Sequence, residues 1–470
     1  MRKTKIICTI GPASMDEEVL TQMCLAGMNV ARMNFSHGTH EEQAKKMDLV
    51  KKVRQKLNLP IAILLDTKGP EYRIRTFKEE KVQIETGADF TFTIDEIEGD
   101  ETKVAVNYKQ LHKDLKPGDI VTVNNGMVKF QVEKIVGHNI VTKCLVGGVL
   151  SDRKSMSFPN KVMSGPYLSE QDRADIIFGI QQGVDFVAAS FVSTKQDVLD
   201  IRKLLDENGG ADIEIIAKIE NQSGVDNIVE ICQNCGGIMI ARGDLGVEIP
   251  FVEVPAVQKK LTRICRMMGK RVITATEMLE SMIHNPRPTR AEITDVANAV
   301  YDGTSCVMLS GESAAGKYPV EAVKTMAEIA EYTEQHTDYK QRFLSTGYVG
   351  KDKLDCISHA VCAMAMDVNA KGIVVCSASG KTAMLVSRFR TPVDIIGMTT
   401  NVKIWRRLSM SWGVTPIMAE QFPSMDVMFY YAQKAAVNLL NLQSGDNIVL
   451  TGGVINGSSG NTDTIKIETV

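Results

Sequence analysis

Two short segments of the sequence combine charged residues in a pattern that could carry out chemistry. The first is Lys218-Ile219-Glu220 and the second contains Gly243-Asp244; each follows a short apolar run of the kind that forms a buried strand. Because the carboxyl ends of parallel strands meet on one side of an α/β fold, we expect Lys218, Glu220 and Asp244 to converge. Two carboxylates suit a hard divalent cation, and an ammonium group can neutralise charge on a substrate held by that ion. The pattern predicts a metal-assisted reaction that forms anionic oxygens.

Strand-like runs alternate with helical runs through most of the chain. We expect strands at 5–10, 29–34, 62–66, 186–189, 214–219, 237–241, 271–275 and 306–309. Apolar residues spaced three and four apart predict helices between most of them, for example at 16–26, 41–56, 194–208 and 254–268. Eight such βα units predict an α/β fold with a closed (β/α)8 TIM barrel.

Two further domains are expected besides the barrel. Short alternating runs separated by turn sequences fill residues 70–167, which predicts a small β-barrel lid domain inserted in a barrel loop. The remaining segments, 1–69 and 168–340, together approach the roughly 250 residues of a TIM barrel. Strand–helix alternation resumes in 341–470, which predicts a C-terminal α/β regulatory domain with strands at 372–376, 394–398, 414–418 and 447–450.

The composition permits a large soluble enzyme, and we expect it to be cytoplasmic. The chain has 470 residues, of which 44% are hydrophobic, and 54 Lys and Arg against 57 Asp and Glu give a net charge of −3. That balance provides no global field to attract nucleic acid or an anionic membrane. The first residues run directly into a strand without an apolar signal region, and no run has the length of a membrane helix. The ten cysteines lie mostly in apolar runs, which predicts buried, reduced thiols.

Polar residues directly follow six of the eight predicted strands, at positions that would face one mouth of the barrel. They are found at 32–38, 66–71, 218–220, 244, 276–277 and 310–312. A single one of these residues is more simply explained as a helix cap or a satisfied ion pair. Six strand ends together favour a reaction site.

At these positions the sequence resembles pyruvate kinase, of the bacterial type without an extra C-terminal domain. The matching runs are Asn34 to Gly38, Leu64 to Glu71, Lys218 to Asn221, Ala241 to Pro250, Thr274 to Thr276, Asn285 to Glu292 and Asp302 to Gly311, all in the order of the family. Long uninterrupted runs are far more specific than a lone glycine pattern. The resemblance extends over the whole chain and is weakest in the insertion.

The resemblance implies transfer of the phosphoryl group of phosphoenolpyruvate to ADP, which gives pyruvate and ATP in glycolysis. Lys218, Arg32 and Thr276 would be catalytic, with Lys218 and Arg32 against the phosphoryl group and Thr276 assisting protonation of the enolate. Glu220 and Asp244 would hold Mg²⁺ or Mn²⁺. The substrate would be bound by Arg32, Lys218, Gly243, Asp244 and Thr276.

The resemblance also implies a potassium site and a nucleotide site. The potassium ligands would be Asn34, Ser36, Asp66 and Thr67. Glu71 occupies a position where a glutamate goes with potassium dependence, whereas a lysine would supply the positive charge itself. The nucleotide would be bound by Pro12, Asn34, His37, Arg73 and, from the closing lid, Lys154. The sequence departs from the family pattern at Asn124, Asn125, Ser155, Glu277 and Ala315.

A segment of the third domain could bind a phosphate-bearing effector. Ser377, Ser379, Gly380, Lys381 and Thr382 follow a strand and open a helix. A capped helix start is the alternative interpretation, and Val375 replaces the first glycine of a Walker A loop. The resemblance implies a sugar phosphate or nucleotide effector here, with help from the glycine-rich stretch 452–460. It also implies a homotetramer, and Leu408 and Met410, in a helix expected at 405–412, could face the core or a partner chain.

Two other functions remain open on the sequence. A metal-dependent lyase could make a pyruvate enolate by cleaving a carbon–carbon bond with the same metal and carboxylates, and it would need no lid, nucleotide or potassium. A non-catalytic effector-binding protein would be expected to have lost Lys218, Glu220 or Asp244, and all three are present. An ADP-dependent signal in a coupled pyruvate assay distinguishes the kinase from both.

Overall fold

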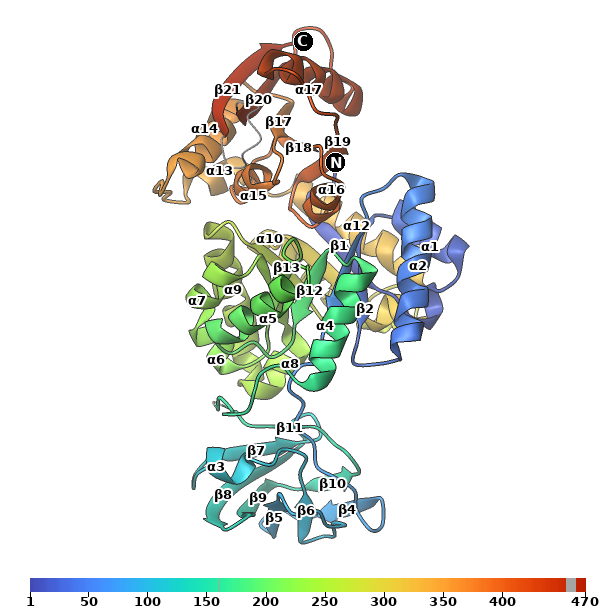
Figure 1. Ribbon diagram of the computed structural model, residues 1–470, viewed down its shortest axis with the longest axis vertical. Helices are drawn as coiled ribbons and strands as arrows, with labels where there is room; N and C mark the ends of the chain where they lie inside the picture. The colour runs from blue at the N-terminus through green and yellow to red at the C-terminus, as the bar shows by residue number, and fades with distance from the viewer. Residues whose placement is uncertain (160, 454–461) are drawn as a thin grey trace.

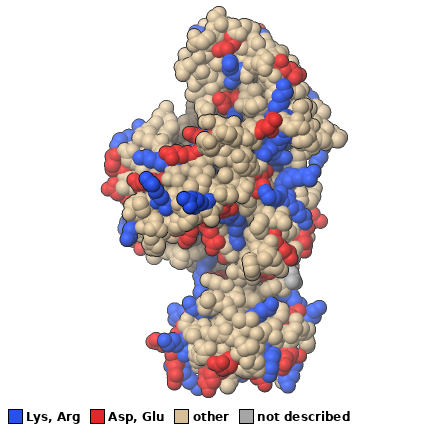
Figure 2. Space-filling model, turned by 180° about the vertical axis from the view of Figure 1, so that it is seen from behind, with Lys and Arg blue, Asp and Glu red and all other residues tan. Residues whose placement is uncertain are grey.

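The computed structural model describes residues 1–159, 161–453 and 462–470. The protein is elongated, with the barrel in the middle, the β-rich insertion at one end and the C-terminal domain at the other (Figure 1). Its N-terminus lies beside the C-terminal domain. The space-filling view shows a narrow neck between barrel and insertion, and charges of both signs are interspersed over that face (Figure 2).

The central domain is a closed barrel of eight parallel strands, in the order β1-β16-β15-β14-β13-β12-β3-β2. The strands are β1 (Lys5–Thr9), β2 (Met28–Asn34), β3 (Ala62–Asp66), β12 (Phe186–Ala189), β13 (Glu214–Ile219), β14 (Gly237–Ala241), β15 (Arg271–Ala275) and β16 (Cys306–Leu309). The predicted TIM barrel is confirmed. Nearly every strand residue is buried, as expected when a parallel sheet is covered on both faces.

Helices cover the outside of the barrel, and short helical turns lie in its loops. They are η1 (Pro12–Ser14), α1 (Glu17–Leu25), α2 (His40–Leu57), α4 (Glu170–Gln182), α5 (Lys195–Glu207), α6 (Gln222–Asp226), α7 (Ile228–Asn234), α8 (Arg242–Glu248), η2 (Phe251–Glu253), α9 (Val254–Met267), η3 (Glu280–Ile283), α10 (Arg290–Asp302), α11 (Gly311–Ala314) and α12 (Pro319–Gln335). The next helix, α13 (Tyr339–Leu344), packs Phe343 into the core of the C-terminal domain. Local chemistry sets several ends. Thr39 and Glu42 form a capping box that starts α2, and Thr289 and Glu292 form another that starts α10.

The insertion is built from two small sheets around one core. A six-stranded sheet has the order β11-β7-β8-β9-β5-β6, and β4 pairs with β10. The elements are β4 (Lys81–Ile84), β5 (Asp89–Thr93), β6 (Lys103–Ala105), α3 (Leu111–Asp114), β7 (Ile120–Val123), β8 (Val128–Val136), β9 (Asn139–Val146), β10 (Gly148–Ser151) and β11 (Met156–Ser157). Phe90, Phe92 and Phe130 pack together in its centre. The chain leaves the barrel after β3 and returns before α4, and we propose 70–167 as the extent of this domain and 341 as the start of the next.

The C-terminal domain is a five-stranded sheet in the order β19-β18-β17-β20-β21. Its elements are α14 (Lys353–Asp367), β17 (Gly372–Cys376), α15 (Lys381–Ser387), β18 (Asp394–Thr399), α16 (Val402–Leu408), β19 (Val414–Met418), α17 (Met425–Leu440), β20 (Asn447–Gly453) and β21 (Thr462–Thr469). Sequence analysis did not predict β21, an edge strand antiparallel to β20, because its alternating Thr, Lys and Glu side chains give little apolar signal. Residues 454–461 of the glycine-rich stretch lie outside the described residues.

The segment after α16 joins the third domain to the barrel. The helix ends at Leu408, earlier than the predicted 412, and the chain then runs beneath the barrel. Met410 is fully buried in the core cluster inside the barrel strands, and Leu408 is buried in the C-terminal domain. Both therefore face the core of this chain rather than a partner. Nine of the ten cysteines are buried, Cys356 being the exposed one. Among the described residues, no helix is both long and apolar enough to cross a membrane.

Candidate active site

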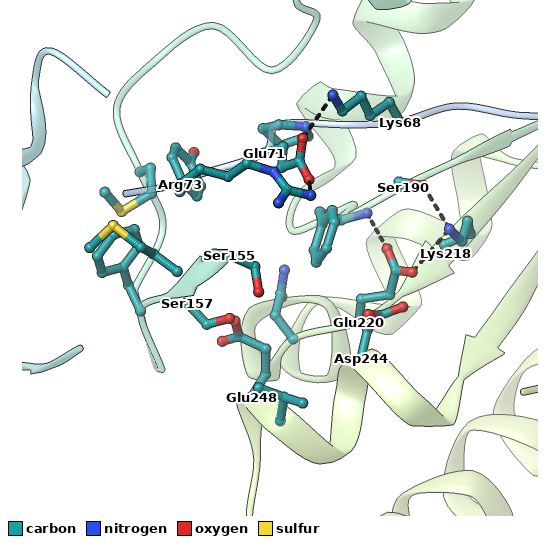
Figure 3. A pocket seen from close by; sticks show the side chains of 18 of the residues that line it. Lys68, Glu71, Arg73, Ser155, Ser157, Ser190, Lys218, Glu220, Asp244 and Glu248 are labelled. Atoms are coloured by element: carbon teal, nitrogen blue, oxygen red, sulfur yellow. Dashed lines mark hydrogen bonds and ion pairs between the residues drawn. The ribbon is translucent and has the colours of Figure 1, made fainter. Parts of the chain in front are cut away.

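Lys218 lies at the mouth of the barrel between two carboxylates. Its Nζ is 3.0 Å from Asp66 Oδ1 and 3.0 Å from Glu220 Oε1, and it donates a 2.7 Å hydrogen bond to Ser190 Oγ (Figure 3). Lys218 is 8% exposed. Burial opposes its charge, but Asp66 and Glu220 outweigh burial and raise the pKa of Lys218 above its usual value. A permanent ammonium group is therefore fixed at this mouth.

Asp66 connects Lys218 to a second cation. Arg32 Nε lies 2.6 Å from Asp66 Oδ2, and Arg32 also donates to Thr9 Oγ1 at 2.9 Å. Burial would raise the pKa of Asp66, but Arg32 and Lys218 hold it below its usual range. One buried carboxylate thus holds two cationic side chains from two separate barrel strands, β2 and β13, and both line the same cavity.

Glu220 and Asp244 have the properties of a metal-binding pair. Glu220 is fully buried, and its Oε2 accepts a 2.6 Å hydrogen bond from the backbone N–H of Phe191. Its Oε1 accepts no hydrogen bond from the described residues, because the nearby Lys218 ammonium lies outside hydrogen-bond geometry. Burial raises the pKa of Glu220 to about 7, Lys218 opposes that rise, and the Asp244 charge adds to it. Asp244, in the first turn of α8, lies next to Glu220 at the cavity (Figure 3).

A divalent cation fits this pair because it would satisfy the orphaned Glu220 oxygen and offset the repulsion from Asp244. Among the described residues, no group of three or more His, Cys, Asp or Glu side chains could hold a metal. The protein would therefore supply two carboxylates, and the remaining ligands would be oxygens of substrate or water.

Thr276 is held beside Gly243 by backbone geometry. Thr276 and Glu277 both adopt left-handed backbone conformations, with φ of 70° and 52°. This turn aims the Thr276 hydroxyl at the start of α8, where Thr276 Oγ1 accepts a 2.8 Å hydrogen bond from the Gly243 N–H and donates a 2.6 Å bond to the Ala275 carbonyl. Thr276 and Gly243 therefore meet as expected, although neither lines the main cavity directly.

The expected potassium ligands come together at the ends of β2 and β3. Asn34 and Asp66 are register partners on these strands, and Asn34 Oδ1 accepts a 3.1 Å hydrogen bond from the Ser36 N–H. Ser190 Oγ donates a 2.6 Å bond to the Thr67 carbonyl, which ties the fourth expected ligand to the hydroxyl that contacts Lys218. All four residues thus lie close to Lys218.

A cavity of about 610 Å³ lies between the barrel mouth and the insertion. Its lining includes many of the residues singled out from the sequence: Arg32, Asn34, Ser36, His37, Arg73, Lys154, Lys218, Glu220 and Asp244. Pro12, exposed at the start of η1, does not line it. The insertion contributes Arg73 and Lys154 to the lining of this cavity, and the barrel contributes Lys218.

Glu71 is neutralised by two cations of its own segment. It pairs with Lys68 Nζ at 2.8 Å and also with Arg73 (Figure 3). Burial would raise the pKa of Glu71, but the hydrogen bonds from Arg73 and Lys68 hold it below its usual range. Its negative charge is therefore already compensated in this conformation.

The insertion touches α8, the helix that carries Asp244. Ser157 of β11 and Glu248 both line the cavity, and their side chains face each other there (Figure 3). A Cβ placed on Gly126 would lie 3.3 Å from Val247. Asn124 and Asn125, where the sequence departs from the family pattern, both have positive φ, which asparagine tolerates better than most residues.

The expected effector segment forms a compact turn at the start of α15. Ser377 Oγ accepts a 3.1 Å bond from the Gly380 N–H, and Gly380 has a positive φ of 74°. Thr382 is buried, with its hydroxyl 2.7 Å from the hydroxyl of Thr462. Lys381 is exposed. Some of the polar groups of the segment are thus already hydrogen-bonded within the protein.

Four residues that contact or border the candidate site were not found from the sequence. Thr9 is the last residue of β1 and Ser190 directly follows β12, but neither lies in the runs that match the family. A serine directly after Phe186–Ala189 was nevertheless a usable signal. Glu248 lies within the Ala241 to Pro250 run but showed no chemistry by spacing alone. Arg242 could only be recognised by its contacts in three dimensions.

Known protein families, sequences and structures are similar to this chain over nearly its whole length. The family described as pyruvate kinase, barrel domain, matches residues 1–323, and the family described as pyruvate kinase, alpha/beta domain, matches residues 355–468. A pyruvate kinase of Clostridium acetobutylicum is 46% identical over 473 residues, covering 100% of both chains. One of Staphylococcus saprophyticus is also 46% identical, over 100% of this chain and 81% of the relative. The crystal structure of a pyruvate kinase from Cryptosporidium parvum aligns with a TM-score of 0.95 at 36% identity, over 100% of this chain and 96% of that chain.

Proposed function

The chain belongs to the pyruvate kinase family and transfers the phosphoryl group of phosphoenolpyruvate to ADP, and from that premise we propose how its residues divide the reaction. The observation that supports the division is the contact of the buried Lys218 ammonium with Asp66, Glu220 and Ser190. Members of this family generally need Mg²⁺ and K⁺. The runner-up lyase would leave the cavity face of the insertion without a role.

Arg32 and Lys218 face the phosphoryl group. Both cations are anchored by Asp66, so they need little reorganisation when charge develops on the transferring oxygens. Lys218 then remains beside the enolate oxygen that the loss of phosphate leaves. Because its pKa is raised, Lys218 stays charged through the reaction and serves as an electrostatic stabiliser rather than as a proton donor.

Glu220 and Asp244 would hold Mg²⁺ or Mn²⁺. The bound ion supplies Lewis-acid stabilisation of carboxylate and phosphate oxygens. The N–H groups of Gly243 and Asp244, in the first turn of α8, would bind the substrate carboxylate. Thr276 Oγ1 accepts a hydrogen bond from the Gly243 N–H, so substrate binding at α8 would directly affect the hydroxyl that assists enolate protonation.

Asn34, Ser36, Asp66 and Thr67 would hold K⁺. The convergence of these residues at two strand ends supports this assignment. With Glu71 already paired with Lys68 and Arg73, no free cation of this segment replaces the monovalent ion. We expect KCl to activate the wild type in sodium-free tetramethylammonium buffer, and equal rates with and without KCl would refute this.

The nucleotide would lie between the barrel and the insertion. His37, Arg73 and Lys154 line the cavity and offer the positive charge and hydrogen-bond donors that a diphosphate requires, with Asn34 beside them. Pro12 would border the base from outside this cavity.

We also propose a mode of regulation and assembly, which family membership supports. Ser377, Ser379, Gly380, Lys381 and Thr382 would bind a sugar phosphate or nucleotide effector, and the chain would form a homotetramer. Substituting Lys381 and Thr382 should abolish activation by such a ligand, whereas unchanged activation curves would contradict the assignment.

A coupled assay tests the division of roles. Phosphoenolpyruvate, ADP and Mg²⁺ should give pyruvate, read through lactate dehydrogenase, only when ADP is present. Lys218→Met should lower kcat by about 100- to 1,000-fold, the cost of one preorganised electrostatic group. Lys195→Met, at an exposed lysine of α5, is the matched control and should leave kcat unchanged. Similar kcat values for the two variants would contradict the central role of Lys218.

A further inference from the structure

Arg242 makes a set of contacts that the catalytic roles above do not use. It lies directly before Gly243 and Asp244, at the junction of β14 and α8. Its side chain does not line the reaction cavity; instead it borders a separate groove on the barrel surface. Any role in the reaction must therefore act through other residues.

The Arg242 guanidinium group binds the turn that presents Thr276. Its Nη2 donates to the Thr276 carbonyl at 2.6 Å and approaches the Glu277 carbonyl at 3.3 Å, while its Nε donates to the Ala275 carbonyl at 3.3 Å. The same Nη2 lies 3.0 Å from Met278 Sδ. One side chain thus contacts four consecutive residues at the end of β15.

This turn is one that the backbone does not adopt readily. Thr276, a β-branched residue, has φ of 70°, and Glu277 follows with φ of 52°. Such a conformation persists only where surrounding contacts hold it. The planar, always charged guanidinium group can donate several hydrogen bonds in a fixed geometry, which a lysine cannot reproduce.

Asp295 of α10 fixes Arg242 in turn. Arg242 Nη1 lies 2.7 Å from Asp295 Oδ1, and only 12% of the arginine side chain is exposed. The chain of contacts therefore runs from Asp295 through Arg242 to the carbonyl groups at 275–277, and from Thr276 Oγ1 back to the Gly243 N–H at 2.8 Å.

We propose that Arg242 is a positioning residue that clamps the 275–277 turn and so keeps the Thr276 hydroxyl against the first turn of α8. The metal ligand Asp244 and the proposed proton-transfer residue Thr276 are then set relative to each other by one side chain. This inference rests on the proposed role of Thr276, and the tests below separate the two.

The kinetic test is a double-mutant cycle with Arg242→Lys and Thr276→Ala. We expect Thr276→Ala to lower kcat by about 100- to 10,000-fold, the scale of losing a positioned general acid–base group. Arg242→Lys, which removes only a positioning contact, should lower kcat by about 10- to 100-fold. Because Arg242 acts through Thr276, the double variant should lie within about twofold of Thr276→Ala alone. Multiplying losses would overturn the clamp, and so would wild-type kcat in Arg242→Lys if Thr276→Ala lowers kcat. Arg263→Lys, an exposed arginine on α9, is the matched control and should leave kcat unchanged.

A structural readout does not depend on what Thr276 does in catalysis. In a crystal structure of Arg242→Lys, the hydrogen bond between Thr276 Oγ1 and the Gly243 N–H should be broken, and amide exchange across 241–249 should accelerate. An unchanged turn would overturn the proposal. If Thr276→Ala has wild-type activity while this turn does move, the role of Thr276 fails and the clamp stands. Should Arg242→Lys not fold, Asp295→Asn, which loosens only the anchor, should shift the same two readouts in the same direction, and no shift would refute the clamp.

Discussion

Ser190 offers the sharpest test of how the cationic centre is held. Its hydroxyl accepts a 2.7 Å hydrogen bond from Lys218 Nζ and donates a 2.6 Å bond to the Thr67 carbonyl. Ser190 is 1% exposed, so water cannot replace the hydroxyl without rearrangement. Ser190→Ala therefore removes one of the three partners of a buried ammonium and leaves both carboxylates in place.

The size of the effect follows from those contacts. A hydrogen bond to a charged group contributes about 1.5–3 kcal/mol, and each 1.36 kcal/mol is about tenfold in rate. If the contact positions Lys218 for the transition state, Ser190→Ala should lower kcat/KM for phosphoenolpyruvate by about 10- to 150-fold. The fall should be in kcat more than in KM, because the lysine stabilises charge that develops during transfer.

The matched control is Ser193→Ala. Ser193 lies in the same loop and lines the same cavity, but its hydroxyl accepts from Asn221 rather than from Lys218. The measurement is the initial rate of ADP-dependent pyruvate formation for both variants, with thermal unfolding as a check that each is folded. A kcat/KM for Ser190→Ala within about twofold of the wild type would refute the reasoning.

Three other predictions concern the metal pair, the insertion and the domain junction. Glu220→Gln should weaken Mn²⁺ binding, measured by titration calorimetry. Losing a group that only orients a metal ligand costs roughly 10- to 100-fold in affinity, and the loss of Glu220 should cost more than that. Glu248→Gln should leave the Mn²⁺ affinity nearly unchanged. Burial raises the pKa of Glu248 from 4.5 to about 7, so the stability gained from its protonation is complete below about pH 4.5 and is lost as the pH rises through about 7. Glu248→Gln, measured without divalent metal, should therefore gain about 1–3 kcal/mol over the wild type between pH 5 and pH 8, and a difference that does not change with pH would contradict the assignment. Met410→Ala should lower the free energy of unfolding by about 2–5 kcal/mol because it leaves a cavity inside the barrel. Met418 is half-exposed, so Met418→Ala should lower it by less than about 0.5 kcal/mol. Equal losses for the two variants would rule out a buried packing role for Met410.

The barrel could be predicted because its signal is local. Runs such as Ala62–Asp66, Gly237–Ala241 and Arg271–Ala275 are short, apolar and bounded by polar residues, and the structure has strands at those bounds. Edge elements gave weaker signals. The polar strand Thr462–Thr469 was missed, and α16 ends at Leu408 because the chain turns there to place Met410 beneath the barrel.

The sequence by itself determined which chemical groups stand at the strand ends. Lys218 lies in β13 and Glu220 directly follows this strand, with one residue between them, and this spacing alone aims both side chains to the same side. Such relations depend on neighbours along the chain, so they can be read without a structure.

Only the tertiary structure decided how those groups are held. Asp66 binds Arg32 and Lys218 at once, and Ser190 accepts a hydrogen bond from Lys218. Arg242 donates to the Thr276 carbonyl, directly after β15. Each contact joins residues far apart in sequence, and its existence depends on barrel closure and strand register to within about an ångström. Periodicity identifies the faces of strands and helices, but hydrogen bonds between separate elements are fixed only when all the elements pack together.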